Sequence, residues 1–166
     1  MDDLRKLVET AAIQALMAKR VRCIDEKDWE GLASVYSDDC KSYSFGDAAG
    51  TGEATIGGQA IAENTARVLT GLKTVHQVHF PEIEFQSDVD ATGIWPLNDV
   101  LASEKDGKRS WMRAYGHYRQ SYRKDAHGWQ IVEHRLTRLL VENGVDDIVT
   151  GSVSYTHLTL PTSDLV

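Results

Sequence analysis

Asp25 and His76 are the two residues whose types and surroundings best support acid–base chemistry in this sequence. Asp25 follows Ile24 and lies four residues after Val21, so a continuing helix turns its carboxylate toward an apolar stripe. A carboxylate in that position needs a partner. Arg22, three residues earlier, would form a routine surface ion pair, whereas a histidine supplied by a sheet would form a functional pair. Spacing alone leaves both pairings open.

The segment TVHQVHF carries two histidines, His76 and His79, in a strand-like pattern. Alternation places His76 on the same face as Thr74 and sends His79 to the opposite face. Two such diverging side chains cannot readily share a metal ion, whose nitrogen ligands must each lie about 2.0 to 2.1 Å away. We therefore expect no metal site, and at most one of the two histidines should face a pocket. Without a carboxylate beside it, that histidine would have a structural role instead.

Asp99 and Arg138 are charged residues within otherwise apolar strand patterns. Asp99 alternates with Leu97 and Leu101 in GIWPLNDVLA, so burial there would require a hydrogen-bonded partner. The alternative is an edge or bulge position near Pro96, from which the carboxylate would reach water. Arg138 alternates with aliphatic side chains in HRLTRLL, and it could equally extend its charged end to solvent from an edge strand.

The elements that must position these residues follow two different hydrophobic periods. Apolar residues first recur at intervals of three and four, which predicts helices, and from residue 73 onward they alternate, which predicts strands. We expect helices over 3–26, 29–36 and 59–70, a short strand over 41–45, and strands near 73–87, 91–103, 110–123 and 129–142. Helices followed by an antiparallel meander indicate an α+β fold.

Residues 46–58, GDAAGTGEATIGG, separate the second and third predicted helices. They carry five glycines and show no apolar periodicity. This composition predicts a loop, and we expect that the loop gates a pocket.

The end of the chain differs in character from the rest. Residues 153–162, VSYTHLTLPT, resemble the translation of a sequencing adapter rather than a protein segment. We therefore expect one domain over residues 1–150 and a non-native tail over 151–166. The alternative is a genuine polar extension, and under either interpretation His157 is given no catalytic role.

Composition places the chain among ordinary globular domains and argues against several partner classes. At 166 residues it has the length of one domain, at roughly 150 residues each. It has 18 basic and 25 acidic residues, a net charge of −7, which disfavours nucleic acid and anionic lipid as partners. We find no signal-peptide pattern and no run of roughly 18 apolar residues, and two cysteines are too few for a disulfide framework. A cytoplasmic location is therefore expected.

Other catalytic chemistries find little support in the sequence. The motifs GxSxG, GxxxxGK[ST] and HExxH are absent, and no GxGxxG follows a predicted strand. Cys23 lies inside a predicted helix, where a thiol more often packs as a small core residue than acts as a nucleophile.

Four blocks of the sequence together resemble the SnoaL-like branch of the nuclear transport factor 2-like superfamily. They are RCIDEKDWEGLASVYSDD, TVHQVHFPEIEF, DATGIWPLNDVL and YRKDAHGWQIVEHRLTRL. Within the superfamily the chain is similar to bile acid 7-alpha-dehydratases and hexachlorocyclohexane dehydrochlorinases, and more distantly to scytalone dehydratases. The resemblance runs from about residue 4 to 142. It implies a cone, in which a curved mixed sheet is wrapped by about three N-terminal helices around an interior pocket.

The resemblance also implies an activity and a set of site residues. Asp25 and His76 fall on the catalytic aspartate–histidine dyad of these enzymes, which implies a lyase that removes water or halide from a small hydrophobic cyclic molecule. Arg138 falls on an arginine that would polarise a carbonyl or the leaving group, and Asp99 on an aspartate that lines the pocket. Arg20 stands where related enzymes have tyrosine or lysine, so a cation there implies an anionic leaving group or a substrate carboxylate.

Three more residues are candidates for substrate binding, namely Tyr43, Tyr115 and His117. A tyrosine on such a sheet can also serve packing alone. Two alternative functions of the same fold remain: an isomerase or polyketide cyclase that moves a proton without expelling a group, and a non-catalytic module that binds small molecules. The resemblance implies no metal or organic cofactor, and it implies a homo-oligomer, with a trimer favoured.

Overall fold

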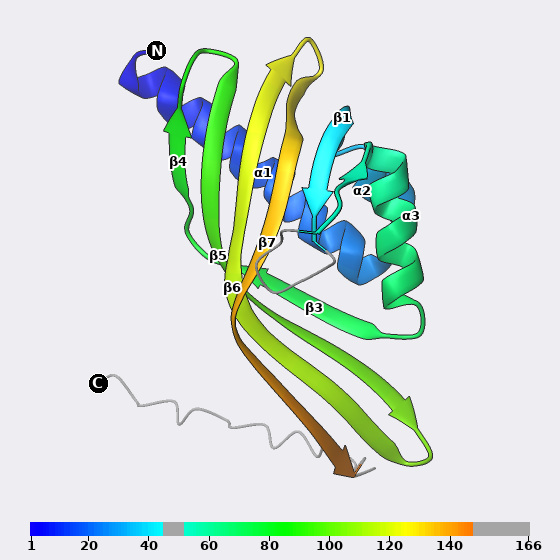
Figure 1. Ribbon diagram of the computed structural model, residues 1–166. Helices are drawn as coiled ribbons and strands as arrows, with labels where there is room; N and C mark the ends of the chain where they lie inside the picture. Colours follow the sequence, from blue (N-terminus) through cyan, green and yellow to red (C-terminus); the bar gives the residue numbers. More distant parts are fainter. Residues whose placement is uncertain (45–51, 148–166) are drawn as a thin grey trace, which may run out of the picture.

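The computed structural model describes residues 1–44 and 52–147, within which three helices pack against one strongly curved sheet (Figure 1). The helices are α1 (Asp3–Glu26), α2 (Trp29–Ala33) and α3 (Gly58–Leu69), and the strands are β1 (Tyr36–Tyr43), β2 (Thr55–Ile56), β3 (Lys73–Val78), β4 (Glu82–Phe85), β5 (Asp90–Lys105), β6 (Lys108–Asp125) and β7 (Gly128–Asp147). Residues 46–51 of the predicted gating loop and the whole of the predicted tail lie outside the described residues. Among the described helices, none is long and apolar enough to cross a membrane.

The long helix α1 has the bounds that the apolar period predicts. It begins after Asp2, whose carboxylate accepts the backbone N–H of Arg5 at 2.8 Å. It ends at Lys27, whose left-handed backbone (φ 64°) closes the last turn by donating its N–H to main-chain carbonyls of that turn. Asp25 therefore lies in the final turn of the helix, just before the chain changes direction.

The second helix is shorter than predicted, because the chain joins the sheet earlier. α2 ends at Ala33, and the carbonyl of Val35 already accepts the backbone N–H of Ile131 from β7. Tyr36 therefore begins strand β1 rather than ending a helix. β1 runs parallel to β7, so the predicted antiparallel meander holds for β5, β6 and β7 but the sheet as a whole is mixed.

The predicted strand over 73–87 is in fact two strands, β3 and β4, which both pair with β5. The break falls at Pro81, which has no N–H to donate to a ladder, and the preceding Phe80 is 92% exposed. The strand order is β2-β1-β7-β6-β5-β3, with β4 beside β5, so β3 lies at an edge of the sheet.

A bulge in β7 redirects the last strand at the bend of the sheet. Tyr115 pairs with Leu140 and Gly116 with Arg138, which leaves Leu139 without a partner in the ladder. The strands approach closely at this point, since a Cβ on Gly116 would lie 1.9 Å from the carbonyl oxygen of Thr137. Beyond the bend, β5, β6 and β7 extend past the helices as a three-stranded arm (Figure 1).

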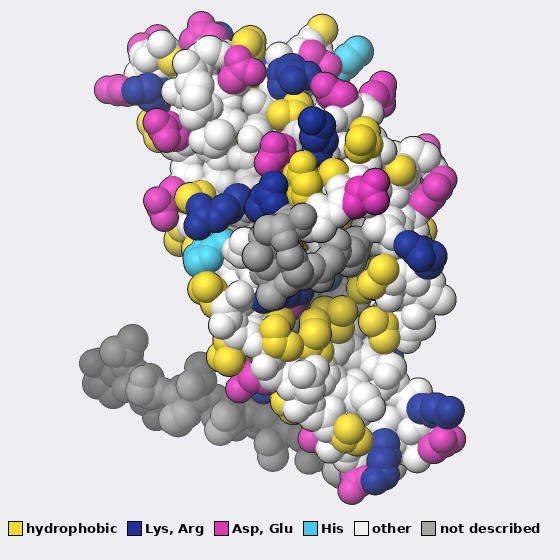
Figure 2. Space-filling model, viewed as in Figure 1, with side chains coloured by type: hydrophobic (Ala, Val, Ile, Leu, Met, Phe, Trp, Pro, Cys, Tyr) yellow, Lys and Arg dark blue, Asp and Glu magenta, His cyan; other side chains and the backbone are white. Residues whose placement is uncertain are grey.

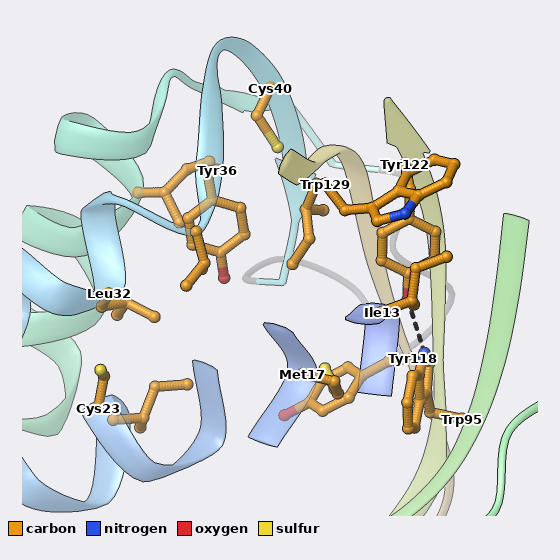
Figure 3. Close-up of a cluster of buried hydrophobic side chains, with 14 of the residues drawn as sticks. Ile13, Met17, Cys23, Leu32, Tyr36, Cys40, Trp95, Tyr118, Tyr122 and Trp129 are labelled. Carbon is orange, nitrogen blue, oxygen red and sulfur yellow. Dashed lines mark hydrogen bonds between the residues drawn. The ribbon is translucent and has the colours of Figure 1, made fainter. Parts of the chain in front are cut away.

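The hydrophobic core lies between the helices and the sheet and contains buried residues of all three helices and of β1, β5, β6 and β7. Figure 3 shows Ile13 and Met17 of α1 facing side chains from the strands, including Tyr118 and Trp95. The indole N–H of Trp95 donates to the hydroxyl of Tyr122 at 2.7 Å, so the polar atoms of two buried aromatic rings satisfy each other. This core holds in place the helix and strands that carry the charged residues of the candidate active site.

Candidate active site

Asp25 and His76 form a directly hydrogen-bonded pair across the junction of helix α1 and strand β3. The Oδ1 atom of Asp25 lies 2.7 Å from Nδ1 of His76, and its Oδ2 atom accepts the backbone N–H of the same residue at 2.8 Å. The side chain of His76 is only 7% exposed, and that of Asp25 is 25% exposed. With Nδ1 donating to the carboxylate, the neutral imidazole presents the lone pair of Nε2 on its other side.

The edge position of β3 explains why Asp25 can hold both the ring and the backbone of one residue. A strand at the edge of a sheet has N–H groups that no neighbouring strand accepts, and Asp25 accepts one of them. Burial by itself would raise the pKa of Asp25, but the hydrogen bonds from the ring and backbone of His76 outweigh burial and lower it. The aspartate is thus held ionised against the imidazole.

The other side of His76 faces a second ion pair, between Asp99 of β5 and Arg138 of β7. His76 and Asp99 are cross-strand partners, and Nε2 of the imidazole lies 3.9 Å from Oδ2 of Asp99. Arg138 binds this carboxylate through two parallel hydrogen bonds of 2.9 and 2.7 Å. Asp99 is 2% exposed, and the hydrogen-bonded guanidinium of Arg138 offsets the energetic cost of burying its charge.

These groups line a cavity of about 420 Å³ on the concave side of the sheet. Arg20, His76, Asp99 and Arg138 contribute charged or polar atoms to it. Most of the remaining wall is apolar, formed by Ile24, Val68, Leu69, Leu101, Met112 and Leu136. Figure 2 shows hydrophobic side chains gathered near the middle of one face of the molecule, with charged side chains around them and at both ends. The cavity therefore suits a mostly apolar molecule with a small number of polar groups.

Arg20 is a buried cation of the cavity wall, and within residues 1–44 and 52–147 no carboxylate contacts it. Its Nε donates to the hydroxyl of Tyr36 at 2.7 Å, its Nη2 to Nε2 of His134 at 3.0 Å, and its guanidinium stacks on the ring of Tyr118 at 4.4 Å. Its Nη1 atom is buried and has no hydrogen-bond partner among the described residues. Each of these partners is neutral, so the described part of the chain leaves the charge of Arg20 uncompensated.

His134 is a partner of Arg20 that does not itself line the cavity, and analysis of the sequence did not assign it to the site. It is fully buried and lies between Arg20 and the side-chain amide of Gln120, which is 2.9 Å from its Nδ1 atom. Burial lowers the pKa of His134 well below 6.5, and the neighbouring Arg20 cation lowers it further. The alternation along this strand does place His134 on the same face as Arg138. It does not reveal the partner of His134, which is Arg20 of helix α1.

A sequence profile described as the SnoaL-like domain matches residues 5–135 of the chain. The chain belongs to the SnoaL-like domain family. The α+β cone predicted from the sequence, with a curved mixed sheet and about three helices, is confirmed for this nuclear transport factor 2-like fold.

Solved structures with the same architecture include enzymes that eliminate small groups. A scytalone dehydratase-like protein from Novosphingobium aromaticivorans has a TM-score of 0.73 at 22% identity, covering 83% of this chain and 89% of that one. A type 2 hexachlorocyclohexane dehydrochlorinase has a TM-score of 0.73 at 18% identity, covering 98% and 100%. The type 3 dehydrochlorinase of Novosphingobium barchaimii has a TM-score of 0.72 at 18% identity, covering 86% and 94%. At these identities the likeness establishes the fold alone.

Within this SnoaL-like domain, three of the predicted substrate-binding residues lie away from the cavity. Tyr115 and His117 are separated from the cavity-lining Tyr118 by an odd number of positions on β6, so their side chains point to the opposite face of the sheet. Tyr43 packs under the guanidinium of Arg135, 4.0 Å from its ring centre, and does not line the cavity either. The structure thus brings together five predicted residues, namely Asp25, His76, Asp99, Arg138 and Arg20, and separates these three from them.

Among the described residues, no three His, Cys, Asp or Glu side chains are arranged to hold a metal ion. His79, the second histidine of TVHQVHF, is exposed and contacts Asn98 at 3.0 Å instead of facing the cavity. His79 lies just past the end of β3 and is exposed, whereas His76 on β3 lines the cavity, so the two histidines are separated as the alternation predicts.

Proposed function

We propose that this protein is a cofactor-independent lyase, a dehydratase or dehydrohalogenase, that acts on a small hydrophobic cyclic substrate. The observation that carries the proposal is the Asp25–His76 pair, with its 2.7 Å contact and with His76 among the residues that line the cavity. This arrangement leaves Nε2 free to accept a proton from a substrate carbon. The family relationship and the dehydrochlorinase and dehydratase neighbours support the same class of reaction.

The elimination would proceed by transfer of a C–H proton to Nε2 of His76. The electrons of that C–H bond form the new double bond, and the leaving group departs with the electrons of its own bond to carbon. Asp25 holds the tautomer with Nδ1–H and stabilises the imidazolium that forms. A halide departs as the anion, whereas a hydroxyl group must gain a proton, which the imidazolium can return if both groups lie on the same face.

The polar groups of the cavity suggest where the departing group sits. Both hydrogen bonds of Arg138 described above go to Asp99, so this pair contributes little net charge. Arg20, in contrast, has an unpartnered Nη1 atom and only neutral contacts among the residues that the structure describes. We propose that Arg20 stabilises negative charge on the departing group or binds a carboxylate of the substrate. The apolar wall favours an alicyclic or polycyclic carbon skeleton.

The contacts of Asp99 and His76 weigh against the two alternative functions. An isomerase or cyclase of this fold would be favoured by a protonated Asp99 that donates a hydrogen bond, yet both oxygens of Asp99 accept from Arg138. A binding module would be favoured by an imidazole isolated from any carboxylate, yet His76 touches Asp25. The lyase is therefore the function that the geometry supports best.

The test is a screen of alicyclic alcohols and alkyl halides for alkene formation and halide release. On any substrate that the parent converts, His76→Ala is expected to lower kcat/KM by about 10² to 10⁴-fold, the usual contribution of a positioned base. Asp25→Asn should lower it as well, because the amide no longer stabilises the imidazolium. His79→Ala is the matched control and should stay within about threefold, since it changes an exposed histidine of the same segment. A loss below about tenfold in His76→Ala would refute the role of His76 as the base.

A further inference from the structure

The carboxylate of Asp25 has further partners besides His76. The hydroxyl of Thr74 lies 2.9 Å from Oδ1 of Asp25, and the ammonium of Lys27 lies 2.8 Å from the same hydroxyl oxygen. Thr74 is buried and shares a face of β3 with His76, whereas Lys27 is the residue that closes helix α1. Lys27 also lies over the ring of Trp29 at 5.9 Å. The end of α1 and strand β3 therefore meet at one carboxylate oxygen.

The direction of these hydrogen bonds is determined by the chemistry of the groups. An ammonium can only donate, so the hydroxyl of Thr74 must accept from Lys27. A hydroxyl has one proton, and the carboxylate beside it can only accept, so that proton points to Asp25. Oδ1 thus receives the hydroxyl of Thr74 and Nδ1–H of His76, while Oδ2 receives a backbone N–H. Any partial rotation of the carboxylate would weaken at least one of these three hydrogen bonds.

We propose that Thr74 and Lys27 are positioning residues, which form a directed relay Lys27–Thr74–Asp25 that fixes the carboxylate against the imidazole of His76. The inference rests on the proposed function, because a fixed carboxylate matters for catalysis only if His76 is the base. Neither residue touches the cavity, so each acts through Asp25.

The location of Asp25 explains why such support is needed. Asp25 lies in the last turn of α1, where the unpaired carbonyl groups carry partial negative charge and disfavour a carboxylate. Lys27 supplies a cation at this helix end. Its ammonium donates a hydrogen bond to the hydroxyl of Thr74, and that hydroxyl donates one to Asp25. The hydroxyl of Thr74 is among the groups that lower the pKa of Asp25, although burial, the largest influence, and both donors of His76 act on the same group. Partial burial lowers the pKa of Lys27 while Asp25 opposes that change, as expected for two coupled groups.

The experiment is a pH titration of the Asp25 carboxyl carbon by NMR in the full chain, with the signal assigned by Asp25→Asn. Thr74→Val removes the hydroxyl and keeps the shape of the side chain, so the pKa of Asp25 is expected to shift upward. Thr74→Ser keeps the hydroxyl and should restore the parent value. Lys27→Met removes the charge and should give a smaller upward shift of the pKa of Asp25. Because Lys27 lies nearer the surface than Thr74, this variant keeps the test available if Thr74→Val fails to fold.

Thr65→Val is the matched control, because Thr65 is an equally buried threonine whose hydroxyl donates to the carbonyl of Ile61 in its own helix. It should leave the pKa of Asp25 at the parent value. The inference is overturned if Thr74→Val and Lys27→Met both leave that pKa unchanged, or if Thr65→Val shifts it as much as Thr74→Val does.

The proposed function has a separate readout in the same samples, namely the Nδ1–H signal of His76. This signal should move in Asp25→Asn if the pair exists. If it does not move, the dyad and the proposed function fail together. If it moves while Thr74→Val leaves the pKa of Asp25 unchanged, only the relay is refuted.

Discussion

Acidification should destabilise this protein through His134, which lies buried beside a cation. The imidazole is fully buried, its Nε2 atom accepts from Arg20 at 3.0 Å, and its Nδ1 atom lies 2.9 Å from the amide of Gln120. Burial and the charge of Arg20 hold the pKa of His134 well below 6.5. In the unfolded chain the same imidazole accepts a proton near pH 6.5. Between these two pKa values, the unfolded state therefore binds one more proton than the folded state.

The size of the effect follows from this difference in bound protons. The free energy of unfolding falls by about 1.4 kcal/mol for each pH unit below the unfolded pKa, until the folded pKa is reached. From pH 6.5 to about pH 5 the loss amounts to about 2 kcal/mol. Asp25 and Glu9 also have lowered pKa values, but a carboxylate adds its loss of stability only as the pH falls through its own, more acidic range. The window between about pH 5 and 6.5 thus isolates the histidines.

The assay is urea denaturation of the parent and of His134→Gln across that window. Glutamine cannot be protonated, so the variant should lose about 2 kcal/mol less than the parent, whatever its stability at neutral pH. His127→Gln, at an exposed position, is the control and should keep the slope of the parent. Equal slopes for the parent and His134→Gln would refute the assignment of His134 as a buried neutral imidazole.

Three further substitutions test the supports of the fold. Glu9→Ala should lower the free energy of unfolding by about 1 to 3 kcal/mol in urea, because the buried indole N–H of Trp129 loses its acceptor at 2.7 Å. Arg138→Met should lower it by about 3 to 5 kcal/mol in the same measurement, since Asp99 stays buried without its guanidinium. Gly116→Ala should abolish the folded circular dichroism signal, because its Cβ would lie 1.9 Å from a backbone carbonyl oxygen of β7.

Matched surface changes provide the reference for these losses. Glu63→Ala on α3 and Arg119→Met on β6 alter exposed side chains and should each change the free energy of unfolding by less than about 0.5 kcal/mol. Losses of that small size in Glu9→Ala or Arg138→Met would contradict the roles assigned to these contacts. A cooperative unfolding transition in Gly116→Ala at the parent's urea midpoint would show that the bend tolerates a Cβ.

The residues themselves account for much of the local structure. The three- and four-residue period from Leu4 onward predicts α1 to its observed ends, and it correctly turns Asp25 toward the interior. Alternation correctly separates His76 on β3 from His79, which lies just past the end of that strand. The errors fall where a contact distant in sequence overrides a local preference, as at Tyr36, which enters the sheet because residues around it pair with β7.

The choice of partners for the charged residues could not be made from spacing and alternation alone. Asp25 had Arg22 within reach on its own helix, and in the structure Arg22 pairs with Glu26 while Asp25 contacts a strand some fifty residues later. The face of Tyr115 was equally undecided, since alternation states which residues share a face but not which face is concave. The bulge at Leu139 then changes the phase of β7 beyond Arg138.

The sequence by itself therefore determined the types of chemical group, the elements that carry them and the family to which the chain belongs. Only the tertiary structure decided that His76 lies between two carboxylates, that Asp99 is occupied by Arg138, and that Arg20 has no anionic partner in the described residues. The physical reason is range. Helical and strand periods are set by neighbours a few residues apart, whereas pairing of buried charges depends on which segments the curved sheet brings within about 4 Å.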